Sequence, residues 1–307
     1  MTPASVKALL PENARSKGRL AALTGGLLLS FDAVFVRLSG VGAADTAFLF
    51  GLFSALSMAL LIQLTDRRGL AGVLAAGGAP LLASALLMTG SATCFVLSVK
   101  HTAVANTVFI LSARPIFTAA AAWLFLRERT PRALWLAIAG VTGGIFLVVN
   151  GSLAAGNVLG DGFAVLGVTC LGLNGTLWRR YKAMSRLAVV GLGGLCIALV
   201  MFIPASPAAY APRTWLVMAA MGMLSAPLGR ALNAVSTRYI PAAEMATMAI
   251  ISAVLAPAWA FLFFAERPPA SSVAGGAVIF AAIAAYVLAT GRAPARQGAS
   301  APAGPGR

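Results

Sequence analysis

Ten stretches of the chain are long and apolar enough to cross a lipid bilayer, and this feature limits the possible folds most strongly. A spanning helix needs about 20 apolar residues to cross about 30 Å of hydrocarbon. The stretches lie near residues 19–38, 46–64, 79–99, 104–126, 133–150, 161–178, 187–204, 214–235, 242–264 and 271–290. Backbone polar groups in lipid must be satisfied inside a segment. The stretches therefore predict an all-α integral membrane protein with ten transmembrane helices.

The charges predict how these helices are oriented. The chain carries 23 Lys and Arg residues and a formal net charge of +15, but the basic residues are spread thinly through short loops, which argues against a nucleic-acid partner. With the N-terminus inside, 17 basic residues lie on the cytoplasmic side and 4 on the other side, so both termini are expected in the cytoplasm. We expect a cytoplasmic segment at 1–18 and a disordered cytoplasmic tail, rich in Ala, Pro and Gly, at 291–307.

The chain contains an internal repeat. The segment from Ser98 matches the segment from Ser236 without gaps, and both copies end on Glu-Arg-x-Pro, at Glu128 and Glu266. A second match places residues 31–37 over 173–179, at a slightly larger offset, so the halves differ a little in length. Two related halves follow from these matches.

We predict five-helix halves at 19–150 and 151–290. Because five is odd, the second half enters the membrane from the opposite side, which makes the repeat inverted and places Glu128 at the cytoplasmic face and Glu266 at the outer face. Secondary transporters are often built this way, with the substrate site at the interface of the halves near mid-membrane. A duplicated scaffold without transport is the alternative.

Ten spans in two inverted halves, with Glu-Arg-x-Pro before the last helix of each, resemble the EamA type of the drug/metabolite transporter superfamily. The resemblance covers about residues 19–290. The layout is also similar to that of YddG-type exporters of amino acids. The family resemblance implies a transporter of small molecules in the bacterial inner membrane.

Arg114 lies in the middle of stretch 104–126, where a charge costs about 2.5–3.5 kcal/mol on insertion scales and must face protein or water. Asp32, in the first stretch, is the only acidic residue at a similar depth. The two can lie level if their helices are neighbours. They then either neutralise each other as a structural pair or line a central cavity. In that cavity Arg114 would take a substrate carboxylate and Asp32 an ammonium group.

Other residues complete the predicted site. Asn174 occupies the repeat position of Asp32 and is either a neutral group of the cavity wall or a link between helices. Arg230 either reaches the cytoplasmic interface, pairs with Glu244 or belongs to an inner gate. The aromatic residues near these positions, each more often a packing residue than a substrate contact, are Phe31, Phe95, Trp178 and Trp259.

Three prolines inside spans are candidate hinges. A proline has no amide hydrogen and crowds the carbonyl four residues earlier, so Pro115, Pro227 and Pro257 are each expected to bend their helix. The bends are either gating hinges or fixed packing features. Short runs of glycine at 140–144, 191–194 and 275–276 predict close helix packing.

The chain lacks the residues of the main enzyme classes. It has one histidine, no intramembrane pair of acids and no phosphate-binding loop, and its three cysteines show no metal spacing, so we expect no enzyme, no metal and no cofactor. A channel is disfavoured because no filter motif is present. We expect a monomeric exporter of amino acids, aromatic ones included, or related metabolites by alternating access. The alternative is an exporter of cationic drugs, with Asp32 as the cation or proton site.

Overall fold

The computed structural model describes residues 12–127, 132–153, 157–236, 239–240 and 242–291. Within these ranges it leaves out the side chains of residues 12–15, 152–153, 234, 242–252 and 290–291. Most of the predicted N-terminal segment 1–18, nearly all of the predicted tail 291–307, and Glu128 lie outside the described residues. All regular elements of the described part are helical.

The helices follow the order of the apolar stretches. The first part of the chain forms α2 (Glu12–Ser30), α3 (Asp32–Leu38), α4 (Ala43–Thr65), α5 (Gly69–His101), α6 (Val104–Ser112), α7 (Arg114–Leu126) and α8 (Arg132–Leu153). The second part forms α9 (Val158–Arg180), α10 (Arg186–Phe202), the short turn η1 (Pro207–Ala209), α11 (Pro212–Ala219), the π-helical η2 (Ala220–Ser225), α12 (Ala226–Ser236), α13 (Ala242–Phe264) and α14 (Ala270–Gly291).

Eight helical segments of the described residues are long and apolar enough to cross a membrane. Two further segments, Arg186–Phe202 and Ala253–Phe264, are apolar but shorter. Large apolar side chains cover the outside of the bundle, for example Leu136 at 76% and Leu216 at 71% exposure. Such a surface suits lipid and not water. The prediction of an all-α membrane protein is confirmed at this level.

The three candidate hinge prolines have different local structures. The helix breaks at Ala113, between α6 and α7, so Pro115 stands in the first turn of α7, where its missing amide hydrogen has no intrahelical partner to lose. The π-helical turn η2 ends two residues before Pro227. By contrast, α13 runs through Pro257 from Ala242 to Phe264 without interruption.

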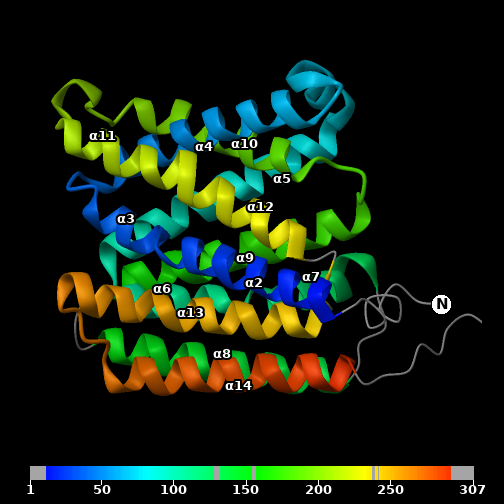
Figure 1. The fold of residues 1–307 in the computed structure, drawn as a ribbon. Coiled ribbons are helices and arrows are strands. Elements are labelled where there is room, and N and C mark those ends of the chain that lie inside the picture. Colours follow the sequence, from blue (N-terminus) through cyan, green and yellow to red (C-terminus); the bar gives the residue numbers. More distant parts are fainter. Residues whose placement is uncertain (1–11, 128–131, 154–156, 237–238, 241, 292–307) are drawn as a thin grey trace, which may run out of the picture.

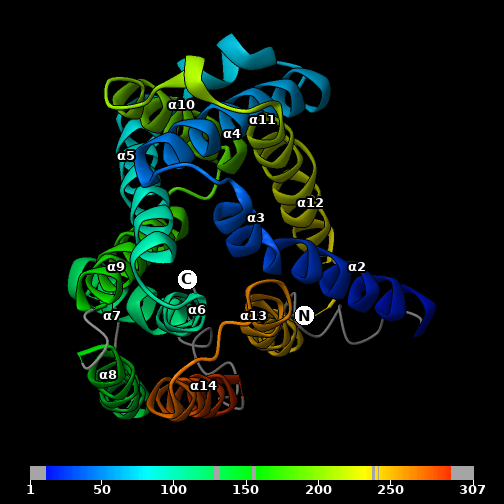
Figure 2. The ribbon, with the colours of Figure 1, turned by 90° about the vertical axis from the view of Figure 1, so that its left-hand side faces the viewer.

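The helices lie side by side, so that the loops gather at two ends of the bundle (Figure 1). One end carries Arg37, His101 and Glu266, and we call it the Glu266 end; the other carries Arg68 and the connection between α9 and α10, and we call it the Arg68 end. Seen from the Glu266 end, the helices form a ring, with α3 and α6 on its inner side (Figure 2). The main packing pairs are α4 with α10, α8 with α14, α5 with α9, and α2 with α12.

Glycines allow the closest of these crossings. A methyl group added at Gly144 of α8 would lie 2.8 Å from the carbonyl oxygen of Gly275 of α14, and one added at Gly275 would lie 2.5 Å from that of Gly144. Gly51 of α4 and Gly194 of α10 meet in the same reciprocal way, at 2.6 and 2.8 Å. The glycine runs at 140–144, 191–194 and 275–276 therefore do mediate close helix approach within one chain.

We predict that Gly144→Ala destabilises the protein and that the adjacent Gly143→Ala does not. The new methyl group at 144 would overlap Ile279 and Gly275, and overpacking of this kind costs about 1–3 kcal/mol. A methyl group at 143 meets no atom within 4 Å, and alanine favours the helix by up to about 1 kcal/mol. Thermal unfolding in detergent measures both; equal melting temperatures for the two variants would contradict the α8–α14 packing.

Candidate functional site

Each end of the bundle has a cavity with charged residues in its lining. At the Glu266 end a cavity of about 390 Å³ is lined by residues that include Arg37, Lys100 and Glu266. At the Arg68 end a cavity of about 660 Å³ is lined by residues that include Arg68, Arg180 and Lys182. The charge of Arg68 is matched by Asp66, whose carboxylate accepts hydrogen bonds from its guanidinium group, and these bonds lower the pKa of Asp66 to about 2.

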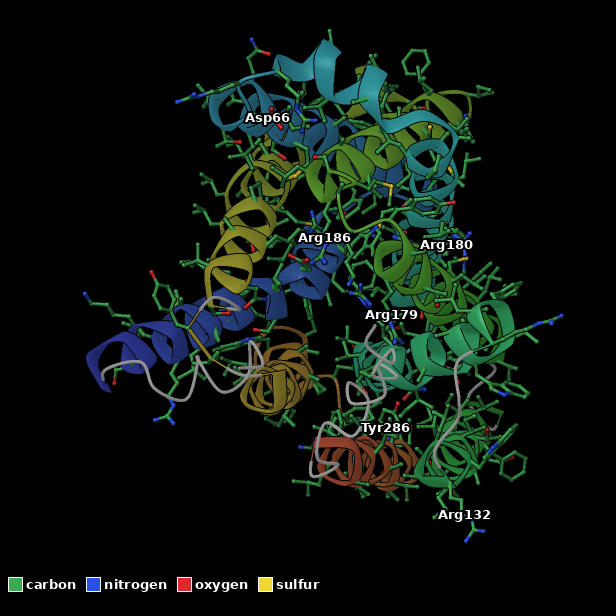
Figure 3. The ribbon with its side chains drawn as sticks, turned by 90° about the vertical axis from the view of Figure 1, so that its right-hand side faces the viewer. Asp66, Arg132, Arg179, Arg180, Arg186 and Tyr286 are labelled. Atoms are coloured by element: carbon green, nitrogen blue, oxygen red, sulfur yellow. The ribbon has the colours of Figure 1, made fainter. Side chains whose placement is uncertain are left out.

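Arg114 contacts Trp178 inside the bundle. Its guanidinium carbon lies 5.5 Å from the centre of the Trp178 ring, and that of Arg186 lies 5.1 Å from the same centre. Arg114 is half-buried, whereas Arg186 is exposed. Viewed from the Arg68 end, Arg186 and Arg179 point into the region that the helices enclose, and Arg132 points outward (Figure 3). Arg114 therefore faces protein and other polar groups, as a charge at this depth requires.

The side chain of Arg114 extends toward the Arg68 end. Gly172 of α9 packs against Phe117 of α7, and Gly175 packs against Thr118. These contacts place residues 172–175 of α9 at the same height along the bundle as residues 117–118 of α7. The backbone of Arg114 consequently lies farther from the Arg68 end than that of Trp178. The charge reaches the Trp178 ring by extending along the bundle, in the way long basic side chains carry their charge away from an apolar interior.

Asn174 and Trp178 belong to a buried hydrogen-bond chain. The indole N–H of Trp178 donates to the hydroxyl of Ser84 at 3.0 Å, and this hydroxyl donates to the side-chain oxygen of Asn174. Asn174 and Ser84 are fully buried. The chain joins α9 to α5 and fixes the face of the ring that Arg114 contacts. A link between helices is one of the two roles expected for Asn174, and its role in a cavity wall stays a prediction.

Asp32 has different neighbours from those of Arg114. Its electrostatic partner is Arg230, and Ser225 lies beside it, whereas the charged neighbour of Arg114 is Arg186. The predicted pairing of Asp32 with Arg114 is not formed among the described residues. Counting residues from the ends of the two spans places Asp32 and Arg114 at the same depth in the membrane. It does not give the direction in which either side chain points.

The predicted aromatic residues fall into three places. Phe31 stacks on Trp259 with ring centres 4.6 Å apart, and the indole N–H of Trp259 donates to Ser30 at 2.9 Å, close to Asp32 in the chain. Trp178 lies with Arg114, as described above. Phe95 packs on the apolar cluster that contains Val96 and Val99. The side chain of Glu244, the other predicted partner of Arg230, lies outside the described residues.

Three functional candidates were not predicted from the sequence. Arg186 looked like an interfacial charge because it begins a helix. Asp161 is fully buried and accepts hydrogen bonds from Thr102 at 2.8 Å and from Asn106 at 3.2 Å. The sequence signal for Asp161 is an acidic residue at the start of an apolar stretch. The third, Glu266, was predicted only to lie at the outer face.

Glu266 ties three segments together at its end of the bundle. It pairs with Arg37 of α3 at 3.3 Å and accepts the backbone N–H of Val104 at 2.6 Å, while Arg37 also donates to the carbonyl of Thr102 at 2.7 Å. These contacts join the first and last thirds of the chain. No cluster of metal-ligating side chains occurs among the described residues.

Comparison with known proteins supports a family assignment. Residues 16–150 match the model of the EamA-like transporter family. This match and the relative described below support membership of the EamA type of the drug/metabolite transporter superfamily. The comparisons support a multi-pass membrane transporter, and they point to transport rather than to enzymatic activity.

Relatives of this EamA-type chain agree with the assignment. The pseudopaline exporter CntI of Pseudomonas aeruginosa, known from two strains, is 28% identical over 200 residues, which cover 62% of this chain and 68% of the relative. The crystal structure of another protein aligns with 91% of this chain and 100% of its own chain, with a TM-score of 0.61 and 16% identity. This second likeness shows a shared fold.

We predict that Asn174→Ala lowers stability more than Asn157→Ala. The first change leaves the buried hydroxyl of Ser84 without its acceptor, at a cost of about 1–3 kcal/mol. Asn157 precedes the same helix, and its side chain makes no capping hydrogen bond there. Melting temperatures in detergent test this, and an Asn174→Ala variant as stable as Asn157→Ala would show that the buried chain does not hold α9 to α5.

Proposed function

We propose that this EamA-type chain is a ten-span transporter, built of two inverted five-helix repeats, that exports amino acids or related metabolites by alternating access. The packing pairs support the inverted repeat. If equivalent helices of the halves are matched, α4 with α10 and α8 with α14 are contacts between equivalent helices. The contact of α5 with α9 is then the equivalent of the contact of α12 with α2.

Individual residues support the same symmetry. Gly25 of α2 packs against the backbone of Gly229 of α12. Their repeat equivalents, Gly167 and Ser91, also contact each other: a methyl group at Gly167 would lie 3.6 Å from the carbonyl oxygen of Ser91. A pseudo-two-fold axis between the halves explains both crossings, and two related halves are what alternating access requires.

The polar neighbours of the first helix of each half correspond as well. Asp32 lies beside Ser225 of η2, and its equivalent Asn174 bonds to Ser84 of α5. The elements that carry Ser225 and Ser84 are equivalent in the repeat. An acid and an amide therefore hold corresponding positions, and the interface between the halves is where an asymmetric substrate would be bound.

The substrate part of the proposal depends on one observation. The guanidinium group of Arg114 lies against Trp178 inside the bundle without a carboxylate partner among the described residues. A substrate carboxylate would supply that partner through a two-pronged, charge-assisted contact. The relative named as a pseudopaline exporter supports export as the direction of transport. Aromatic amino acids fit because Trp178, Phe31 and Trp259 provide rings beside the polar groups.

The proposed membrane is the bacterial inner membrane, with the Arg68 end in the cytoplasm. The basic residues of the described part support this orientation, because Arg68, Arg132, Arg180 and Lys182 lie on segments that the sequence assigns to the cytoplasmic side. The contacts of Glu266 would then close the outer end, and Arg186 would stand at the cytoplasmic entrance.

Export of cationic compounds is the second candidate. One carboxylate oxygen of Asp32 is buried without a hydrogen-bond partner among the described residues. A substrate cation or a proton could occupy it. Arg230 interacts electrostatically with Asp32 and offsets part of its charge, which favours the first proposal.

We predict that Arg114→Gln lowers counterflow of zwitterionic amino acids in proteoliposomes by about 10- to 100-fold, the loss expected for one charge-assisted contact. Arg114→Lys should retain part of the activity, and Arg132→Gln, which changes an outward-pointing arginine, should retain all of it. A protein that prefers cationic compounds and stays fully active as Arg114→Gln would reject the carboxylate site in favour of the second candidate.

A further inference from the structure

Two guanidinium groups share the ring of Trp178. Their carbons lie 5.5 and 5.1 Å from the ring centre, so the distance between the two carbons is no larger than these two distances together. Both groups carry a permanent positive charge. A cation is attracted to the face of an indole ring, but this attraction is smaller than that of a full negative charge. The ring therefore brings two like charges together without neutralising them.

The acidic residues that the structure describes are engaged elsewhere. Five of the eight acidic side chains are described, and their partners are Arg230 for Asp32, Tyr210 for Asp45, Arg68 for Asp66, Thr102 for Asp161, and Arg37 for Glu266. The other three, Glu12, Glu128 and Glu244, lie outside the described side chains. Among described residues the pair of arginines thus has no counter-ion.

The hydrogen-bond donors of the pair are also available. Neither Arg114 nor Arg186 donates a hydrogen bond to an oxygen of the described residues, although each guanidinium has five N–H donors. Arg186 is exposed and points into the region that the helices enclose at the Arg68 end (Figure 3). A ligand that enters from this end would meet Arg186 first and Arg114 farther in.

We propose that Arg114, Arg186 and Trp178 form a binding site for small molecules with two carboxylate groups, one group for each guanidinium. This deepens the proposed function, on which it depends for its place in a transport cycle. Separate carboxylates fit two separated guanidinium groups better than the single compact charge of a phosphate ion. Trp178, held in place by Ser84, spaces the two cations and offers a flat surface to the carbon chain between the carboxylates.

Equilibrium binding by the purified full-length protein in detergent tests the site. The probes are glutarate and adipate, the monocarboxylates of the same length, pentanoate and hexanoate, and inorganic phosphate. We expect one of the dicarboxylates to bind about 10- to 100-fold more tightly than its monocarboxylate, because it gains a second charge-assisted contact. Phosphate should bind no better than the monocarboxylates.

Variants test which residues cause the preference for dicarboxylates over monocarboxylates. Arg186→Gln should bring the dicarboxylate and its monocarboxylate to within about twofold of each other, while Arg186→Lys keeps part of the preference. Arg132→Gln is the matched control, since it removes one outward-pointing arginine and should leave every affinity unchanged. Elution of each variant as a single species shows that it is folded.

Equal affinities for dicarboxylates and monocarboxylates in the unmodified protein would overturn the proposal, as would a dicarboxylate preference that survives in Arg186→Gln or tighter binding of phosphate. The outcome is separate from that of the proposed function. Counterflow of amino acids without any dicarboxylate preference would leave the transporter and remove this site. Binding of dicarboxylates without counterflow of any tested compound would leave the site and remove the transporter.

Discussion

An arginine charge in the middle of an apolar helix must face protein or water, and the arrangement of this bundle turns Arg114 toward Trp178 and the Arg68 end. On insertion scales the charge costs about 2.5–3.5 kcal/mol, so a helix that carries it cannot turn that face to lipid without loss. The break at Ala113 and the packing of α7 against α9 direct the side chain to Trp178. Arg186 at the end of the bundle then forms part of the same polar region.

In the proposed inverted repeat the scaffold is nearly symmetric, but its polar residues are not. Close glycine crossings recur in pairs of helices that the proposed repeat makes equivalent. The chemistry differs between the halves: Asp32 in one corresponds to Asn174 in the other, and Arg114 corresponds to Ser252 in the ungapped match of the two segments. A symmetric scaffold with an asymmetric set of charges can alternate between two states while holding a substrate in one orientation.

The sequence predicts the helices well because apolar length is a property of each segment alone. Each of the ten predicted stretches coincides with helical chain to within a few residues at most ends, although α2 begins at Glu12, earlier than the predicted residue 19, and α5 contains a kink at Gly78. The side-chain partners were harder to predict. Asp32 and Arg114 are level by counting residues, but rotation about each helix axis and the reach of a long side chain decide what they contact. Arg186 and Asp161 were overlooked because charges at helix ends are expected at a membrane interface.

Accessibility of position 114 to water tests the central claim most directly. Arg114→Cys, in a background where Cys94, Cys170 and Cys196 are replaced by alanine, would be treated with a charged, membrane-impermeant thiol reagent in inside-out vesicles and in intact cells. We expect rapid modification from the cytoplasmic side and slow modification from the outside. No reaction from either side, or reaction only with a lipid-soluble reagent, would mean that this position faces acyl chains or a dry interior and would contradict the account.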